Sequence, residues 1–151
     1  MPRLLKQIRT FAQIFEMLQH TFPDDDLRVR SVPDDDTLIT LPPNDVKPAA
    51  LILVEQFDFY HLSTITGLDN GKALELLYHF WNRYGITLHT ILPYNAAHIA
   101  TLTDFIPGAT FYEREIHEML GVTFEGLSDA SPLFLPDDWD EGFPLRKSST
   151  E

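Results

Sequence analysis

The stretch Thr110-Phe-Tyr-Glu-Arg-Glu-Ile-His-Glu-Met-Leu-Gly121 predicts a short amphipathic helix whose two ends are both marked. Thr110 is a favourable N-cap residue, and Glu113, three positions later, completes the pattern of a capping box. Gly121 stands where a C′ glycine ends a helix. One apolar stripe follows from the helical spacing of Tyr112, Ile116, Met119 and Leu120. The stretch therefore predicts a helix that packs through this stripe against the rest of the fold.

The segment after this helix is apolar and aromatic, yet it is interrupted too often for regular structure. Its breakers are Gly126, Pro132, Pro136, Gly142 and Pro144. Its large apolar side chains are Phe124, Leu133, Phe134, Leu135, Trp139, Phe143 and Leu145. Such a segment needs a surface that buries it, which is either the sheet of its own domain or a partner subunit. The sequence leaves both alternatives open.

The order of motifs in this region resembles a known family. The motifs are Glu113-Arg-Glu-x-x-Glu118-Met-Leu-Gly121-x-x-Phe-Glu-Gly126, then Leu135-Pro-Asp-Asp-Trp139, then Pro144-Leu-Arg-Lys147. They are similar to the thirty-kilodalton subunit of respiratory complex I, also called the C subunit of NADH-quinone oxidoreductase, and to the matching subunit of energy-converting, membrane-bound nickel–iron hydrogenases. The resemblance extends more weakly upstream through His61–Asp69, so that it covers about Phe59 to Lys147.

The chain departs from the usual family pattern at two places. It has Gly126-Leu-Ser128 where the family usually has Gly-His-Pro followed by an Arg-Arg pair, and Ser148 where an acidic residue usually follows Arg-Lys. The missing basic residues put in doubt the contacts that they make in complex I. The sequence His117-Glu-Met-Leu120, and the Glu141-Gly pair before the final motif, are closer to those of the hydrogenase branch.

The resemblance implies a non-catalytic structural subunit in the hydrophilic arm of a complex-I-like enzyme, with no intrinsic activity expected. Its partners would be the hydrogenase-like large subunit and the small iron–sulfur subunit. The complex would couple electron transfer to ion translocation. This chain would hold no cofactor and no metal, because the iron–sulfur clusters, and any nickel–iron centre, would belong to the partners. It would be cytoplasmic and lie on the inner face of the cell membrane only through the complex.

We expect the partner to contact the Glu113–Gly126 helix and loop and the Phe134–Lys147 tail. Three basic residues, Arg114, Arg146 and Lys147, stand in an acidic region. Their side chains are either solvated at the surface or make charge-assisted contacts to partner carboxylates, and the resemblance favours the partner contacts. The predicted partner-binding residues are Glu113, Arg114, Glu115, Glu118, Phe124, Gly126, Trp139, Pro144, Leu145, Arg146 and Lys147.

Composition excludes several other classes of function. A formal net charge of −12 argues against binding nucleic acid or anionic lipid. The absence of cysteine excludes disulfides and cysteine-held clusters in these 151 residues. The acidic runs Asp24–Asp26 and Asp34–Asp36 favour solvated turns over a divalent-cation site. The length predicts one domain. The resemblance implies that this domain covers 1–126 and that an extended partner-binding tail covers 127–151.

The remaining pattern predicts an α+β fold. An amphipathic helix is expected over 2–20, and a hairpin over 27–32 and 37–41. A second helix, capped by Asn44 or Asp45, is expected to reach Gln56, with Val46, Ala49, Ala50, Leu53 and Val54 as its buried side. An antiparallel meander is expected over 61–66, 73–81 and 86–92, because the last of these alternates between two faces. Together the strands form a mixed or antiparallel sheet of four to five strands, faced by helices.

The search for catalytic chemistry leaves two alternatives to the subunit. Glu113 and His117 are i,i+4 neighbours, which favours a pair within the helix, as does the spacing of Arg114 and Glu118. A free-standing small enzyme could instead use Glu113, Glu115 and His117 for acid–base or metal-dependent chemistry. The other alternative is a stand-alone binding adaptor, which has a partner but no redox complex.

Overall fold

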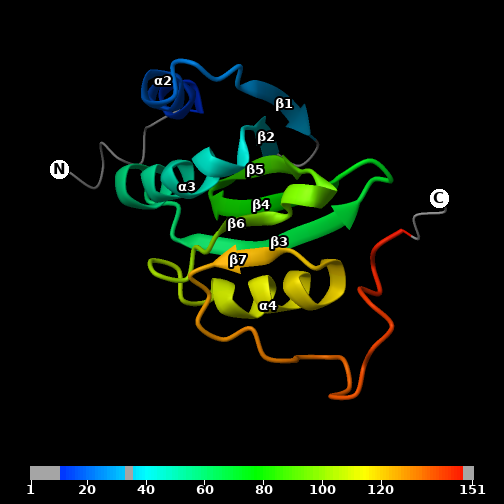
Figure 1. Cartoon of the computed structure of the whole chain (residues 1–151). Helices are drawn as coiled ribbons and strands as arrows, with labels where there is room; N and C mark the ends of the chain where they lie inside the picture. The colour runs from blue at the N-terminus through cyan, green and yellow to red at the C-terminus, as the bar shows by residue number, and fades with distance from the viewer. Residues whose placement is uncertain (1–10, 33–35, 148–151) are drawn as a thin grey trace.

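The described fold is a mixed five-stranded sheet with its helices gathered on one side (Figure 1). The computed structural model describes residues 11–32 and 36–147. The α-helices of this part are α2 (Phe11–Thr21), α3 (Pro43–Phe57) and α4 (Ala109–Leu120). Its strands are β1 (Arg28–Val32), β2 (Asp36–Thr40), β3 (His61–Asp69), β4 (Leu74–Asn82), β5 (Tyr84–Leu92), β6 (His98–Ala100) and β7 (Thr123–Glu125). The α+β prediction is confirmed.

The large sheet has the strand order β1-β2-β5-β4-β3. The predicted meander is confirmed, because β3, β4 and β5 are joined antiparallel. The hairpin of β1 and β2 is also confirmed, although its turn at 33–35 lies outside the described residues. β2 lies parallel to β5, with Ile39 opposite Leu88, and this contact joins the hairpin to the meander.

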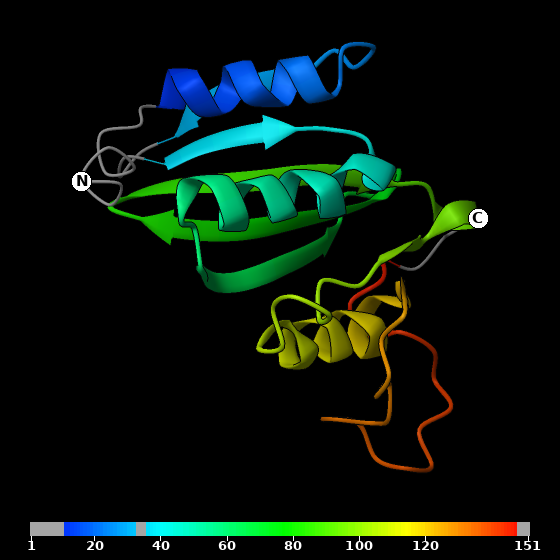
Figure 2. The ribbon, with the colours of Figure 1, turned by 90° about the vertical axis from the view of Figure 1, so that its left-hand side faces the viewer.

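One face of this sheet carries the core. In β4 the side chains that point to this face are Leu74, Leu76, Tyr78 and Phe80, all buried. Figure 2 shows α3 lying across the same face. The predicted buried side of α3 is confirmed at Val46, Ala49, Ala50, Leu53 and Val54. Full burial of a leucine-sized side chain contributes about 1.5–3 kcal/mol, so this layer is the main source of stability.

The start of α3 differs from the expected one, and the start of the helix expected over 2–20 lies outside the described residues. Pro42 is the N-cap of α3 and makes no side-chain cap bond, so the cap expected from Asn44 or Asp45 is wrong. The reason is local, because the helix starts at Pro43, and proline suits a first-turn position that needs no N–H partner. The part of the predicted 2–20 helix before Phe11 lies outside the described residues.

Helix α4 extends the helical layer beyond α3 by packing on β3. The close approach requires a glycine in the strand, because a Cβ at Gly67 would lie 2.7 Å from Leu120 Cδ1 and 3.3 Å from Ile116 Cγ1. The short parallel pair β6 and β7 joins the segments before and after α4, with Ile99 opposite Phe124. The sequence did not predict this pair, since three-residue strands are too short to show an alternating pattern.

The capping box predicted at the start of α4 is wrong. The helix begins at Ala109 with Gly108 as N-cap, and the hydroxyl of Thr110 donates to the Pro107 carbonyl at 2.8 Å. Glu113 turns into the protein instead of reaching back to the helix start. The other end is confirmed, because Gly121 has a left-handed φ of 78° and its N–H donates to the His117 carbonyl at 3.0 Å.

Candidate partner-docking surface

Glu113, the first residue of the quoted motif, is fully buried. Its carboxylate accepts a hydrogen bond from the Thr101 hydroxyl at 2.5 Å and another from the Leu102 N–H at 2.8 Å. Burial raises the pKa of Glu113, and these two hydrogen bonds oppose the rise. The residue therefore ties the loop before α4 to the helix itself, and any contact of Glu113 with a partner stays a prediction.

The sequence spacing suggested a pair between His117 and Glu113, but His117 does not pair with Glu113 in the structure. Its Nδ1 lies 2.8 Å from the Val122 carbonyl oxygen. Since a carbonyl can only accept, Nδ1 is the donor of this bond. The carboxylate of Glu113 and the ring of His117 thus have separate partners, and the described residues hold no cluster of three or more side chains suited to a metal ion.

Glu118 holds the beginning of the tail against α4. Its two carboxylate oxygens accept the N–H groups of Leu133, Phe134 and Leu135 at 3.0, 2.7 and 3.1 Å. Burial alone would raise the pKa of Glu118, but these bonds and the charge of Arg114 outweigh it, so that the pKa lies below its ordinary value. Three charge-assisted hydrogen bonds to one carboxylate make this the main attachment of the tail to the helix.

Arg114 holds the same part of the tail from its other side. Its Nη2 donates to the carbonyls of Ser131 and Pro132, each at 3.1 Å. Its Nη1 lies 3.6 Å from a carboxylate oxygen of Asp129, which replaces the ion pair expected with Glu118. Arg114 thus makes its contacts within the chain.

The end of the tail is bound to the last turn of α4. The Leu145 N–H donates to the Met119 carbonyl at 3.0 Å, and Nε of Arg146 donates to the Leu120 carbonyl at 2.6 Å. These carbonyls belong to the group that a helix leaves without partners at its C-terminus. The Arg146 guanidinium also lies 5.4 Å from the ring centre of Phe143. Arg146 therefore binds the tail to α4, and it also lies at the surface of the tail.

Asp69, at the end of β3, completes the attachment and was not recognised in the sequence. Its carboxylate accepts hydrogen bonds from the Lys147 N–H at 2.8 Å, from the Gly71 N–H at 2.9 Å and from the Tyr94 hydroxyl. Burial would raise the pKa of Asp69, but these bonds outweigh it and lower the pKa. No local pattern could have revealed this role, because Asp69 and Lys147 are far apart in sequence.

The hydrogen bonds of the tail to Glu118 and to Asp69 predict that the tail loosens in acid. The folded-state pKa values of Glu118 and Asp69 lie below their ordinary values of 4.5 and 3.8. Their contribution to stability is therefore complete above the ordinary values and is lost as the pH falls through the lower, folded-state values. We expect the amide protection of 133–135 in hydrogen exchange to fall selectively below about pH 4. Protection that stays constant down to the pH of global unfolding would contradict this.

The tail leaves its aromatic side chains exposed instead of burying them. From Leu127 to Lys147 the chain forms turns and bends without a helix or strand, and it runs along α4, not over the sheet (Figures 1 and 2). Phe111 of α4 and Phe134 meet edge to face, with ring centres 5.8 Å apart. We call the exposed set the α4–tail surface: Phe111, Phe134, Trp139, Phe143 and Leu145.

The other predicted partner residues divide into internal and surface positions. Phe124 is buried, and Gly126 has a φ of +92° with space for no side chain, since a Cβ would lie 2.9 Å from Thr101 Cγ2. Glu115 is half-buried, and Pro144 is exposed beside the α4–tail surface. The division into a domain over 1–126 and a tail over 127–151 stays a prediction.

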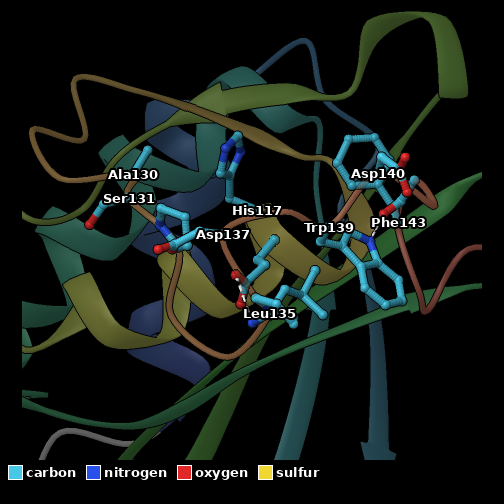
Figure 3. A pocket seen from close by; sticks show the side chains of 12 residues that line it. His117, Ala130, Ser131, Leu135, Asp137, Trp139, Asp140 and Phe143 are labelled. Atoms are coloured by element: carbon cyan, nitrogen blue, oxygen red, sulfur yellow. Dashed lines mark hydrogen bonds between the residues drawn. The ribbon is translucent and has the colours of Figure 1, made fainter.

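A hollow of about 350 Å³ lies between α4 and the tail (Figure 3). The helix contributes His117 and Glu118 to its wall. The tail contributes the rest, which includes Asp137, Trp139 and Asp140. The hollow exists because Glu118 and Arg114 hold residues 131–135 of the tail, while Arg146 holds the end of the tail.

Gly121 allows the tail to pass close to the end of α4, which gives a direct test of the packing. We expect Gly121→Ala to lower the free energy of unfolding by about 2 kcal/mol, because φ is +78° and the new Cβ would lie 2.5 Å from Phe143 Cε2. The control is Gly108→Ala at the other end, where a Cβ meets nothing within 4 Å. Equal urea midpoints for the two variants would contradict the close approach.

Comparison with known proteins identifies the family. Residues 39–150 match the model of the family described as "Respiratory-chain NADH dehydrogenase, 30 Kd subunit". The C subunit of NADH-quinone oxidoreductase from Roseiflexus sp. (strain RS-1) is 30% identical over 143 residues, which cover 90% of this chain and 82% of that protein. The C subunit from Roseiflexus castenholzii is 31% identical over 115 residues, which cover 68% of this chain and 66% of that protein. The C/D subunit from Citrobacter koseri is 45% identical over 89 residues, which cover 59% of this chain and 12% of that protein.

Two solved structures share the fold. A chain of a membrane-bound sulfane sulfur reductase, described as an archaeal respiratory membrane complex, is 25% identical with a TM-score of 0.74, covering 91% of this chain and 84% of that chain. A trypsin-resistant fragment of Nqo5 is 19% identical with a TM-score of 0.65, covering 79% of this chain and 98% of that chain. Within the described residues no helix is long and apolar enough to cross a membrane. The chain therefore belongs to the family of the 30 kDa subunit of the respiratory-chain NADH dehydrogenase.

Proposed function

We propose that this chain is a non-catalytic structural subunit in the hydrophilic arm of a complex-I-like NADH:quinone oxidoreductase or energy-converting hydrogenase. It docks through the α4–tail surface onto the hydrogenase-like large subunit, and it also contacts the small iron–sulfur subunit. The clusters, and any nickel–iron centre, belong to these partners. The chain thus reaches the inner face of the cell membrane only through the complex.

The observation that carries this proposal is an irregular tail that is firmly held yet keeps its aromatic side chains exposed. Hydrogen bonds with Glu118, Arg146 and Asp69 fix the backbone of the tail. A rigid backbone lowers the entropy that is lost on binding, and exposed aromatic side chains are typical of interface centres. Family membership supplies the kind of complex in which such a surface has a partner.

The geometry disfavours the free-standing enzyme. Glu113 is fully buried and bonded to Thr101 and Leu102, and His117 donates to Val122. An acid–base site needs its groups to converge on a place that a substrate can reach. A stand-alone adaptor keeps the same docking surface, so only the identity of the partner separates it from the subunit.

The test is affinity purification of the tagged chain from native membranes, with the iron and nickel of the eluate measured. We expect a hydrogenase-like large subunit and an iron–sulfur subunit to co-purify with the wild-type chain. A chain that elutes alone, or with a partner that carries no redox centre, would overturn the subunit proposal.

Two double variants show whether the α4–tail surface is responsible. Phe134→Ala with Leu145→Ala removes side chains that are 55% and 56% exposed on that surface. Trp81→Ala with Ile91→Ala is the control, with side chains 45% and 46% exposed on the strands of the large sheet. We expect the first pair to reduce partner recovery about tenfold or more, and the control to leave it within about twofold. Equal losses would place the interface elsewhere.

A further inference from the structure

The charged side chains that line the hollow between α4 and the tail are all acidic (Figure 3). Its ionised wall residues are Glu118, Asp137 and Asp140, and neither lysine nor arginine is among the residues that line it. The two oxygens of Glu118 already accept three N–H groups from the tail, so its remaining contribution is negative charge. Asp137 and Asp140 are both exposed at the wall, and their oxygens can still accept bonds from a ligand.

The same hollow has aromatic walls that are held in position. Trp139 is fixed by a hydrogen bond from its Nε1 to the Gly142 carbonyl at 2.7 Å. The Phe143 ring is fixed against the backbone of Gly121 and below the Arg146 guanidinium. Because Arg146 already lies over the Phe143 ring, Trp139 is the aromatic wall residue that we assign to an incoming cation. A ring that is already fixed loses little side-chain entropy when a ligand arrives.

His117 adds one more acceptor. Because its Nδ1 donates to the Val122 carbonyl, the neutral ring has its lone pair on Nε2. The wall therefore offers carboxylates, the Trp139 ring and an imidazole acceptor. A ligand that suits this wall is a flat cation with several N–H donors, which describes a guanidinium better than the compact ammonium of lysine.

We propose that this hollow receives an arginine side chain of the partner subunit. The proposal rests on the proposed function, since it assigns the occupant of one site within the α4–tail surface. The volume of about 350 Å³ lies at the lower end for binding pockets, so it suits one inserted side chain. The occupant is complementary in charge to the wall and shields Asp137 and Asp140 from each other.

The tail supplies a closely matched pair of test variants. Asp137→Asn with Asp140→Asn removes two charges from the wall of the hollow. The control is Asp138→Asn with Glu141→Gln, which removes the same charge from neighbouring residues that do not line it. The dissociation constant of each variant for the purified partner subunit is measured at about 0.15 M salt, where long-range charge effects are screened. We expect the first pair to weaken binding about tenfold or more, and the control less than about twofold.

The outcomes separate this proposal from the proposed function. Suppose that the wild-type chain binds the partner, and that the two double variants either keep their affinity or lose the same amount of it. The arginine site is then wrong and the subunit role stands. If the wild-type chain does not bind the partner, the subunit role fails and the arginine site fails with it.

A photo-crosslinking amino acid at Trp139 then identifies the occupant in the assembled complex. We expect the crosslinked partner peptide to contain an arginine whose replacement by alanine weakens binding of the wild-type chain about tenfold. The same replacement should have less than about a twofold further effect on the Asp137→Asn, Asp140→Asn variant, because the two changes remove one interaction. A crosslinked peptide without arginine, or independent effects of the two changes, would overturn the proposal.

Discussion

Glu113→Ala is expected to lower the free energy of unfolding by about 3 kcal/mol. The substitution leaves the buried Leu102 N–H and Thr101 hydroxyl without their acceptor and opens a cavity beneath α4. An unsatisfied buried donor costs about 1–3 kcal/mol, and the lost packing adds to it. Urea denaturation followed by circular dichroism measures the change as a lower midpoint.

The control for this prediction is Glu115→Ala, two residues further along the same helix. Glu115 is half-buried, and its side chain makes no hydrogen bond or ion pair within the described part of the chain. Its loss should stay within about 0.5 kcal/mol. If the two variants unfold at the same urea concentration, Glu113 does not hold the loop before α4, and its place in the family motif needs another explanation.

The second large effect is expected on assembly instead of on folding. Glu118→Ala removes the acceptor of the N–H groups of Leu133, Phe134 and Leu135. The tail should then be ordered only when the partner binds, and that ordering reduces affinity. We expect partner binding to weaken about 30-fold, which corresponds to about 2 kcal/mol.

Two measurements distinguish a released tail from a damaged fold. Hydrogen exchange should show lost protection at 133–135 while the amides of the β3–β5 meander keep theirs. Glu115→Ala again serves as the control for hydrogen exchange, which it should leave unchanged. A Glu118→Ala chain that binds its partner normally would show that the free chain does not need a preformed tail.

The sequence was sufficient for those elements whose signal is local and repeated. Alternation over 86–92 and the apolar side of α3 predicted the meander and the helix over it, because each pattern continues for seven or more residues. The capping box failed for a tertiary reason. Glu113 fits the local pattern, yet Thr101 and Leu102 offer it hydrogen bonds inside the fold.

The candidate site could be located from the sequence but not sorted into its parts. The motifs predicted that α4 and the tail act together, and they lie against each other. The sequence did not show that Arg114 and Glu118 bind the tail of their own chain. Nor could it reveal Asp69, because its partner Lys147 is 78 residues away. Contacts at such separations depend on the folded arrangement and leave no local pattern.

The most direct test of the docking proposal is a structure of the native complex, purified through this chain, by electron cryomicroscopy. We expect Phe111, Phe134 and Trp139 to lie buried against a large subunit of the complex, while the tail keeps its contacts with Glu118. If the α4–tail surface faces solvent in the complex and the partner instead covers Trp81 and Ile91, the docking proposal is contradicted.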